Sequence, residues 1–219
     1  MIHGFKDKCV TTAEEWLIDY SLKTGNAVDT NIGLLDMPIK FDGKEVDAFI
    51  LDVLGNKLVI QLALPMVTKF DNKSNRYETS YARRLINSNR FLNRFNQEFV
   101  KHIQLTEVHT EDYVTHDKLW LLSHEEAVNR EVNFLKPNHE CYTFEMFKAI
   151  DLEAYSQMLL KYKTHEHKTH GWRLRSACSS VSGCLDSGIV GYVNYHGYVS
   201  YNSACYANGG ALLPACTIC

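Results

Sequence analysis

The C-terminal segment of the chain, residues 177–219, contains no Lys, Arg, Glu, Gln, Met or Trp, and its one acidic residue is Asp186. So few carboxylates argue against calcium-dependent sugar binding, which needs clustered Asp, Glu and Asn oxygens in a loop. The segment is instead built mainly from Tyr, Asn, Ser, Gly, Cys and Ala. Tyr supplies rigid contact area at small entropic cost, and Ser, Asn and Gly supply adaptable hydrogen bonds. This composition is typical of a recognition surface and not of an enzyme cleft.

The whole chain also lacks an excess of positive charge and a long hydrophobic run. It carries 23 Lys and Arg against 26 Asp and Glu, a formal net charge of −3. This balance argues against a nucleic-acid partner bound by phosphate neutralisation. The N-terminus has no apolar core of a signal peptide, and no segment approaches the roughly 20 apolar residues of a membrane span. We therefore expect synthesis in the cytoplasm and no membrane partner.

Seven cysteines are present, five of them in the C-terminal segment: Cys178, Cys184, Cys205, Cys216 and Cys219. An odd number, a chain that is not small and the lack of an export signal favour mostly reduced thiols over a disulfide framework. No Pro-, Gly- or Ser-rich linker divides the 219 residues. We expect a single domain over 1–219, with an N-terminal helical extension at 1–31.

Local patterns predict a mixture of helices and strands. A capping box at Thr12–Glu15 predicts a helix over 12–24, and a second one at Ser123–Glu126 predicts a helix directly after a strand at 118–122. Alternating runs predict a hairpin of 45–53 and 57–64, a strand at 171–176 with one face buried, and a pair at 191–195 and 198–202. Helical periodicity covers 77–103, and 152–162 is a further helix candidate. A final apolar run extends over 211–218.

Three segments occur in an order that resembles a known family: Asn75–Asn87, Lys118–Glu126 and Gly171–Ser176. They are similar to the motifs N-x-Y-x-x-S-x-x-R-x-x-L-N, LLS-x-x-E and W-x-LRS of largely uncharacterised domains from Firmicutes and their phages. That family closes on G-V-R-P-A-L, where this chain has Gly210-Ala-Leu-Leu-Pro-Ala215. Leu213 stands in place of the family's arginine, so no role of that arginine carries over.

The family resembles the C-type-lectin-like fold, in the branch of formylglycine-generating enzymes and of the variable proteins of diversity-generating retroelements. The resemblance implies an α+β domain of antiparallel sheets and flanking helices, whose last strands and loops face a ligand. Retroelements randomise adenines in AAY codons, which cannot yield Lys, Glu, Gln, Met or Trp. The segment 177–219 lacks all five, although all five occur earlier in the chain. It is therefore a candidate variable region.

The candidate ligand-binding residues are the polar and aromatic side chains of this region together with one preceding arginine: Arg173, Tyr192, Asn194, Tyr195, His196, Tyr198, Ser200, Tyr201, Asn202, Tyr206 and Asn208. Tyr side chains would anchor the ligand, since interface energy concentrates in a few buried aromatic or Arg groups. For Arg175 we expect a structural ion pair, whereas Arg173 is open to either role.

Metal and catalytic chemistry find less support. His165, His167 and His170 have a spacing that could ligate Zn or Ni, but the neighbouring Lys163 and Lys168 favour a solvated loop. We expect no metal, no cofactor and no catalytic residue. The leading hypothesis is a non-catalytic binding protein of a phage or prophage, present in the virion, that recognises a protein or cell-surface ligand. The alternatives are a mobile-element regulator or inhibitor that docks on a host protein inside the cell, and a thiol or copper oxidase using Cys205 or Cys216.

Overall fold

The computed structural model describes residues 35, 37–54, 56–110, 113–127, 144, 147, 171–177, 188–194, 196–207 and 210–219. The helices predicted at 12–24 and 152–162, the N-terminal extension, and the candidate residues Tyr195 and Asn208 lie outside these ranges. Within them the chain combines several small sheets with short helices, so the predicted α+β class is confirmed.

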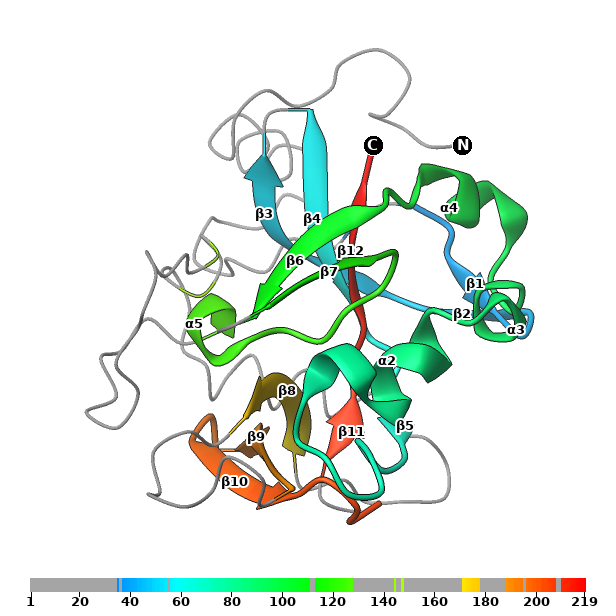
Figure 1. The fold of residues 1–219 in the computed structure, drawn as a ribbon. Helices are drawn as coiled ribbons and strands as arrows, with labels where there is room; N and C mark the ends of the chain where they lie inside the picture. Colours follow the sequence, from blue (N-terminus) through cyan, green and yellow to red (C-terminus); the bar gives the residue numbers. More distant parts are fainter. Residues whose placement is uncertain are drawn as a thin grey trace.

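The elements follow one another as shown in Figure 1. The first half contains β1 (Lys40–Phe41), β2 (Lys44–Glu45), β3 (Ala48–Leu54), β4 (Lys57–Leu62), β5 (Met66–Val67), η1 (Tyr77–Thr79), α2 (Tyr81–Ile86), α3 (Asn89–Leu92) and α4 (Gln97–His102). The second half contains β6 (Thr106–Thr110), β7 (Tyr113–Asp117), α5 (His124–Ala127), β8 (Gly171–Ala177), β9 (Ile189–Asn194), β10 (Val199–Ser203), β11 (Ala211–Leu212) and β12 (Ala215–Ile218).

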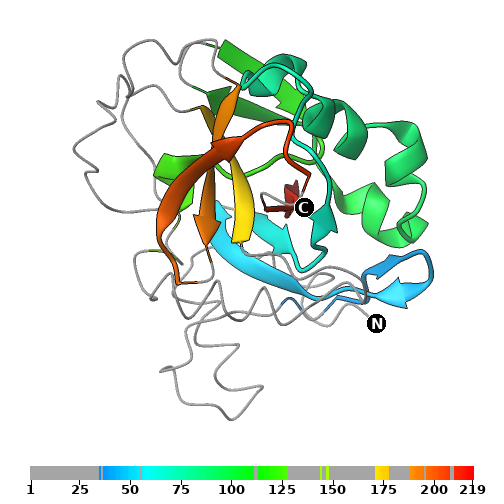
Figure 2. The same ribbon diagram turned by 90° about the horizontal axis from the view of Figure 1, so that it is seen from below.

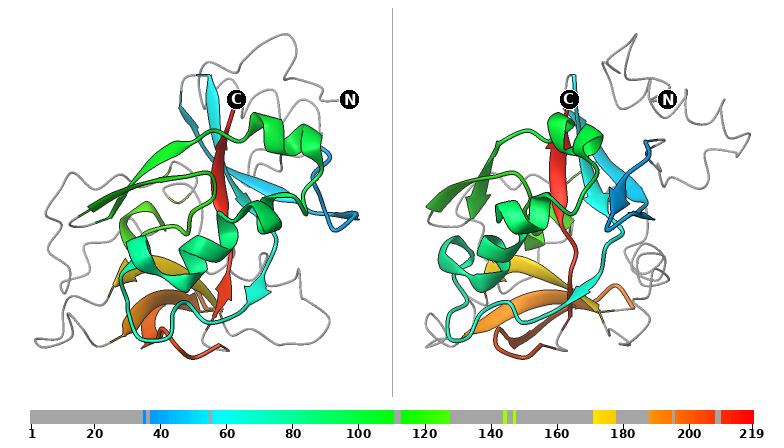
Figure 3. Two further views of the ribbon diagram at one scale, coloured as in Figure 1. Left: turned by 45° about the vertical axis from the view of Figure 1, so that its right-hand side comes forward. Right: turned by 90° about the vertical axis from the view of Figure 1, so that its right-hand side faces the viewer.

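The predicted hairpin around residue 55 is present as β3 and β4, which pair antiparallel with an irregularity between Ile50 and Asp52. The strand β12 pairs with the other edge of β4, from Ala215 opposite Gln61 to Ile218 opposite Leu58. All four residues of β12 are buried, because the apolar C-terminal run completes the core of this sheet. In Figure 3 this C-terminal segment leads from β11 in one sheet to β12 in the other.

The helical segment 77–103 is not one helix. Ser80 and Ser88 have extended backbones, and their hydroxyls accept hydrogen bonds from the amides of Arg83 (3.1 Å) and Phe91 (3.2 Å). A side chain that caps a new helix competes with continuation of the old one, so the segment divides into η1, α2, α3 and α4. The apolar residues of the pattern nevertheless pack together: Phe91 and Phe95 make an edge-to-face contact and Phe95 and Phe99 a tilted one, with ring centroids 5.8 and 5.4 Å apart.

The second large sheet has the order β10-β9-β8-β11-β5, with β8 and β11 parallel and the other pairs antiparallel. It confirms the hairpin predicted in the C-terminal segment, as β9 and β10. From below, β8, β9 and β10 lie side by side, and helices α2 to α4 lie away from them (Figure 2). The strand β10 is therefore at one edge of the sheet, with one paired neighbour among the described strands.

Two local predictions were wrong. Residues 118–122 do not form a regular strand, because the backbone makes only an isolated bridge, between Trp120 and Ala215. The strand β8 exists, but both of its faces are buried and not one: every residue from Gly171 to Ser176 is buried. Trp172 and Leu174 pack in the hydrophobic core, whereas Arg175 is covered by β6 and α5 and Arg173 by the turn 203–206. The alternation of apolar and charged residues does not show that the charged side chains are covered as well.

Candidate ligand-binding face

The motif residues that carry the family resemblance point into the protein. Arg175 of β8 is 2% exposed and forms two hydrogen bonds, of 2.6 and 2.7 Å, with the Glu126 carboxylate of α5. It also donates to the carbonyls of Leu121 and His109 and to the Thr110 hydroxyl. Burial alone would lower the pKa of Arg175, but the adjacent Glu126 charge more than offsets it and the pKa is raised. The structural role expected for Arg175 is confirmed.

Glu126 also closes the predicted capping box. Its Oε2 accepts the Ser123 amide at 2.9 Å, and its own amide donates to the Ser123 hydroxyl at 3.1 Å. Ser176, the last residue of the W-x-LRS motif, accepts the His124 amide at 2.8 Å. The LLS-x-x-E and W-x-LRS segments therefore bind each other.

The first motif is equally internal. Arg83 forms an ion pair with the buried Asp117 at 2.8 Å, and Thr115 donates to the same carboxylate at 2.7 Å. The Asn87 side chain bonds to backbone groups of Lys118 and Leu119, which fixes the start of the irregular segment after β7. Leu213 is fully buried, and its carbonyl accepts from Gln61 at 3.3 Å. The motifs thus explain the fold, and the ligand site must be sought elsewhere.

The turn between β9 and β10 exposes two candidate residues. Asn194 organises it, since its Oδ1 accepts the amides of His196 (2.9 Å) and Tyr198 (3.0 Å). Gly197 adopts the left-handed region at φ 76°, where glycine is favoured. His196 is exposed, and Tyr198 is 65% exposed with its ring 6.4 Å from that of His196. Asn194 therefore shapes the turn, whereas Tyr198 and His196 are presented to solvent.

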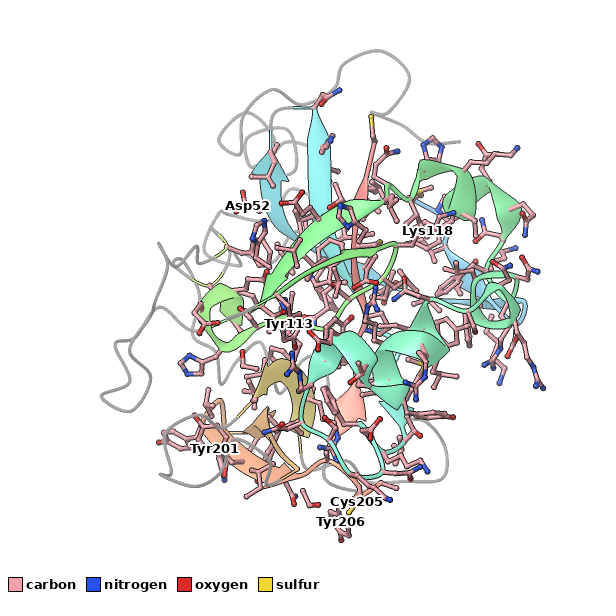
Figure 4. All side chains as sticks on the ribbon, in the orientation of Figure 1. Asp52, Tyr113, Lys118, Tyr201, Cys205 and Tyr206 are labelled. Carbon is pink, nitrogen blue, oxygen red and sulfur yellow. The ribbon has the colours of Figure 1, made fainter. Side chains whose placement is uncertain are left out.

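The other end of β10 exposes a second aromatic residue. Tyr206 is 54% exposed and Cys205 beside it is also exposed, and both lie at the lower edge of the molecule in Figure 4. The five residues of β10, roughly 17 Å of strand at about 3.3 Å per residue, separate this turn from Tyr198. Tyr201, Ser200 and Asn202 lie between them and are half-buried. We call the surface of 196–207 the β10 face.

The sheet register groups three further candidates. Tyr192 lies opposite Arg173 on β8 and opposite Ser200 on β10, so the three form one cross-strand row. Directly opposite residues of antiparallel strands point to the same side of a sheet. Tyr192 and Ser200 are half-buried, whereas Arg173 is completely buried. The structure thus places the row Arg173, Tyr192 and Ser200 across β8, β9 and β10, and the exposed Tyr198 and Tyr206 at the two ends of β10.

Arg173 differs from Arg175 in its surroundings. Its Nη2 donates to the carbonyls of Ser203 (3.3 Å) and Tyr206, but its Nε and Nη1 have no hydrogen-bond partner in the part of the chain that the structure describes. Burial lowers the pKa of Arg173 to about 10. The turn 203–206 covers Arg173, and of its residues only Tyr206 was among the sequence candidates. Gly210, whose added Cβ would lie 3.2 Å from the Arg173 Cγ, was not among them. No pattern in the sequence indicates their proximity, which results from pairing over some thirty residues.

The described cysteines are not disulfide-bonded, and they differ in burial: Cys205 is exposed, Cys219 is half-buried and Cys216 is buried. Burial raises the pKa of the Cys216 thiol, which is 0% exposed in β12. A reactive thiolate needs the opposite, a lowered pKa and solvent access. Among the described residues no three His, Cys, Asp or Glu side chains gather as metal ligands, and His165, His167 and His170 lie outside these residues.

In the described ranges no helix is long and apolar enough to cross a membrane. A family model described as a domain of unknown function (DUF6273) matches residues 55–219. The match begins in the turn between β3 and β4 and includes the whole β10 face. No curated protein and no solved structure gives a significant match to the chain.

Proposed function

This chain belongs to the DUF6273 family, and we propose that it is a non-catalytic protein that binds a protein or cell-surface ligand through the β10 face. The observation that carries the proposal is the position of Tyr198 and Tyr206. They are the exposed aromatic side chains in the described part of the chain, at 65% and 54%, and both flank one edge strand. Exposed Tyr anchors surrounded by Ser and Asn are the composition of recognition surfaces.

The scaffold supports this assignment. Binding residues are most often placed on loops and edges that a rigid framework positions. Here the framework includes the ion pair of Arg175 with Glu126, which joins β8 to α5, and the pair of Arg83 with Asp117, which joins α2 to β7. Neither pair includes a residue of the β10 face. The face can therefore vary in sequence without disturbing the charged interior.

We further propose that the fold is C-type-lectin-like and that the protein acts in a phage or prophage as a receptor-recognition or retroelement-diversified variable protein. The order of the sequence motifs and the absence of five residue types from 177–219 support this. Tyr192, Asn194, His196, Tyr198, Ser200, Tyr201, Asn202 and Tyr206 all fall on or beside β9 and β10. In such a protein these positions would vary while β8 and α5 stay constant.

The DNA around the gene tests the diversification. We expect a reverse-transcriptase gene and a near-repeat of the codons for 177–219 that differs only at adenines. A near-repeat with substitutions spread over all four bases, or none at all, would contradict diversification but would leave ligand binding open. Purified particles test the location, since a virion protein must be detected there by mass spectrometry.

Ligand binding itself is tested by replacing Tyr198 with a photo-crosslinking amino acid. Irradiation with intact bacteria should trap a cell-surface component, while irradiation with a lysate should trap a cytoplasmic protein if the chain is an intracellular regulator. Leu105 offers a matched control, because it is 66% exposed but lies between α4 and β6, away from the β10 face. A product from position 105 equal to that from position 198 would contradict the assignment.

A further inference from the structure

An unpaired buried cation lies under the β10 face. Arg173 is 0% exposed, and two of its three nitrogens lack a partner among the described residues. Leaving a charged group buried without a counter-charge is strongly unfavourable, and buried arginines are normally paired. Arg175, two positions along the same strand, shows the usual solution, with a carboxylate and three further acceptors.

The cross-strand row that contains Arg173 is polar. It continues through Tyr192 to Ser200, whose hydroxyls can donate to an oxyanion. Gly210, at φ +146°, approaches the arginine stem so closely that a Cβ would stand 3.2 Å from its Cγ. Glycine at position 210 thus leaves room for the Arg173 side chain, which a larger residue at that position would crowd.

The turn above Arg173 has one fixed and one exposed half. Ala204 is buried and held by three backbone hydrogen bonds, from its amide to Gly188 and from the amides of Phe70 and Asp71 to its carbonyl. Cys205, Tyr206 and Ala207 beyond it are exposed. Of the two carbonyls that accept from Arg173, that of Tyr206 therefore belongs to the exposed half, which is tied back by a backbone hydrogen bond, from the Tyr206 amide to the Ser203 carbonyl at 3.2 Å. The same residue carries an exposed aromatic ring.

We propose that Arg173 is the receptor for an oxyanion of the ligand, a carboxylate or a phosphate, which replaces the Tyr206 carbonyl when the ligand packs against the Tyr206 ring. This assignment deepens the proposed function and rests on it, because it names the chemistry that the β10 face recognises. An acidic ligand group would supply the missing counter-charge, since a guanidinium binds carboxylate and phosphate through charge-assisted hydrogen bonds.

The test uses small anions as probes and the wild-type protein. Arginine side-chain N–H signals are followed by NMR while sodium acetate or inorganic phosphate is added, with sodium chloride at matched ionic strength as reference. We expect a saturable shift of the Arg173 Nε–H signal and an unchanged Arg175 signal, because the Arg175 donors are already bonded. The stronger response, to acetate or to phosphate, identifies the oxyanion.

Three results would overturn the proposal. An Arg173 signal that does not shift on addition of acetate or phosphate would contradict an anion site. So would an Arg173 signal that shifts together with that of Arg175 and by the same amount in sodium chloride. The third result concerns Asp186, the one acidic residue of 177–219. If Asp186→Asn shifts the Arg173 signal and abolishes its response to acetate, the counter-charge of Arg173 comes from the chain itself and not from a ligand. The titration needs no identified ligand, so its failure is separate from a failure of crosslinking at Tyr198. Crosslinking without anion binding would retain the β10 face and reject only the role of Arg173.

Discussion

The ion pair between Arg175 and Glu126 should be the most sensitive polar contact of the described fold. We consider Glu126→Gln, which removes the negative charge but keeps the size of the side chain. Gln is also accepted at the last position of a capping box, so the hydrogen bonds with Ser123 can persist. The substitution therefore isolates the loss of the charge from the loss of the helix cap.

The magnitude follows from burial. Arg175 is 2% exposed and Glu126 is 18% exposed, so a neutral partner leaves the guanidinium uncompensated away from water. Breaking a buried pair by removing one partner costs about 3–5 kcal/mol. Gln keeps one acceptor oxygen for Arg175 and loses the other, because its amide nitrogen donates, so we expect about 3 kcal/mol. This is a large part of the roughly 5–15 kcal/mol that stabilises a typical domain.

Urea unfolding followed by Trp fluorescence measures the loss, because Trp120 and Trp172 are both buried. Asp42→Asn is the matched control: it removes the charge opposite Arg94 in a pair of similar geometry that is about half exposed on both sides. We expect the control to change the unfolding free energy far less. Equal effects of the two substitutions, or a loss below about 1 kcal/mol for Glu126→Gln, would refute the role given to this pair.

Three further outcomes are expected. Burial lowers the pKa of His124, and the charge of Glu125 opposes this in part. As the pH falls, the unfolded chain therefore takes up a proton at His124 at a higher pH than the folded chain does, and the unfolding free energy should fall below about pH 6.5. The fall should be smaller in His124→Gln. Iodoacetamide followed by peptide mass spectrometry should modify the exposed Cys205 in the native protein, and Cys216 only after unfolding; early modification of Cys216 would contradict its burial. In Gly171→Ala the new Cβ would stand 2.1 Å from the Val193 carbonyl oxygen, so β8 and β9 must separate at a cost of about 2–3 kcal/mol, measured by urea unfolding. Gly43→Ala, with open space around the Cβ, should cost only its left-handed backbone, about 1 kcal/mol.

Local signals predicted the elements that depend on local chemistry. The alternation on both sides of residue 55 identified β3 and β4, and Ser123 with Glu126 identified a helix start that the structure reproduces bond for bond. The segment 77–103 failed for a related reason: its periodicity was genuine, but the capping preference of Ser80 and Ser88 prevailed. A periodic pattern describes which face is buried, whereas the caps decide where each helix begins.

Features that depend on distant pairing were not predictable. The burial of Arg173 follows from β8 lying between β9 and β11 and from the turn at 203–206, which a single strand pattern does not contain. The exposure of Tyr198 is different, because a residue at a hairpin turn between two recognised strands is expected to face solvent. The exposure of Tyr198 therefore follows from local sequence, whereas the position of Tyr206 in the turn 203–206 and the buried charge of Arg173 required the structure.

The central claim is that the β10 face binds the ligand, and its most direct test is the affinity of Tyr198→Ala/Tyr206→Ala for the partner trapped by crosslinking. If the two rings are anchors, each loss costs about 2 kcal/mol or more, which is about 30-fold in the dissociation constant. The double variant should therefore bind roughly 1,000-fold more weakly if the two losses add, while Leu105→Ala binds like the wild type. Circular dichroism would establish that the double variant is folded. A folded double variant with unchanged affinity would contradict the account.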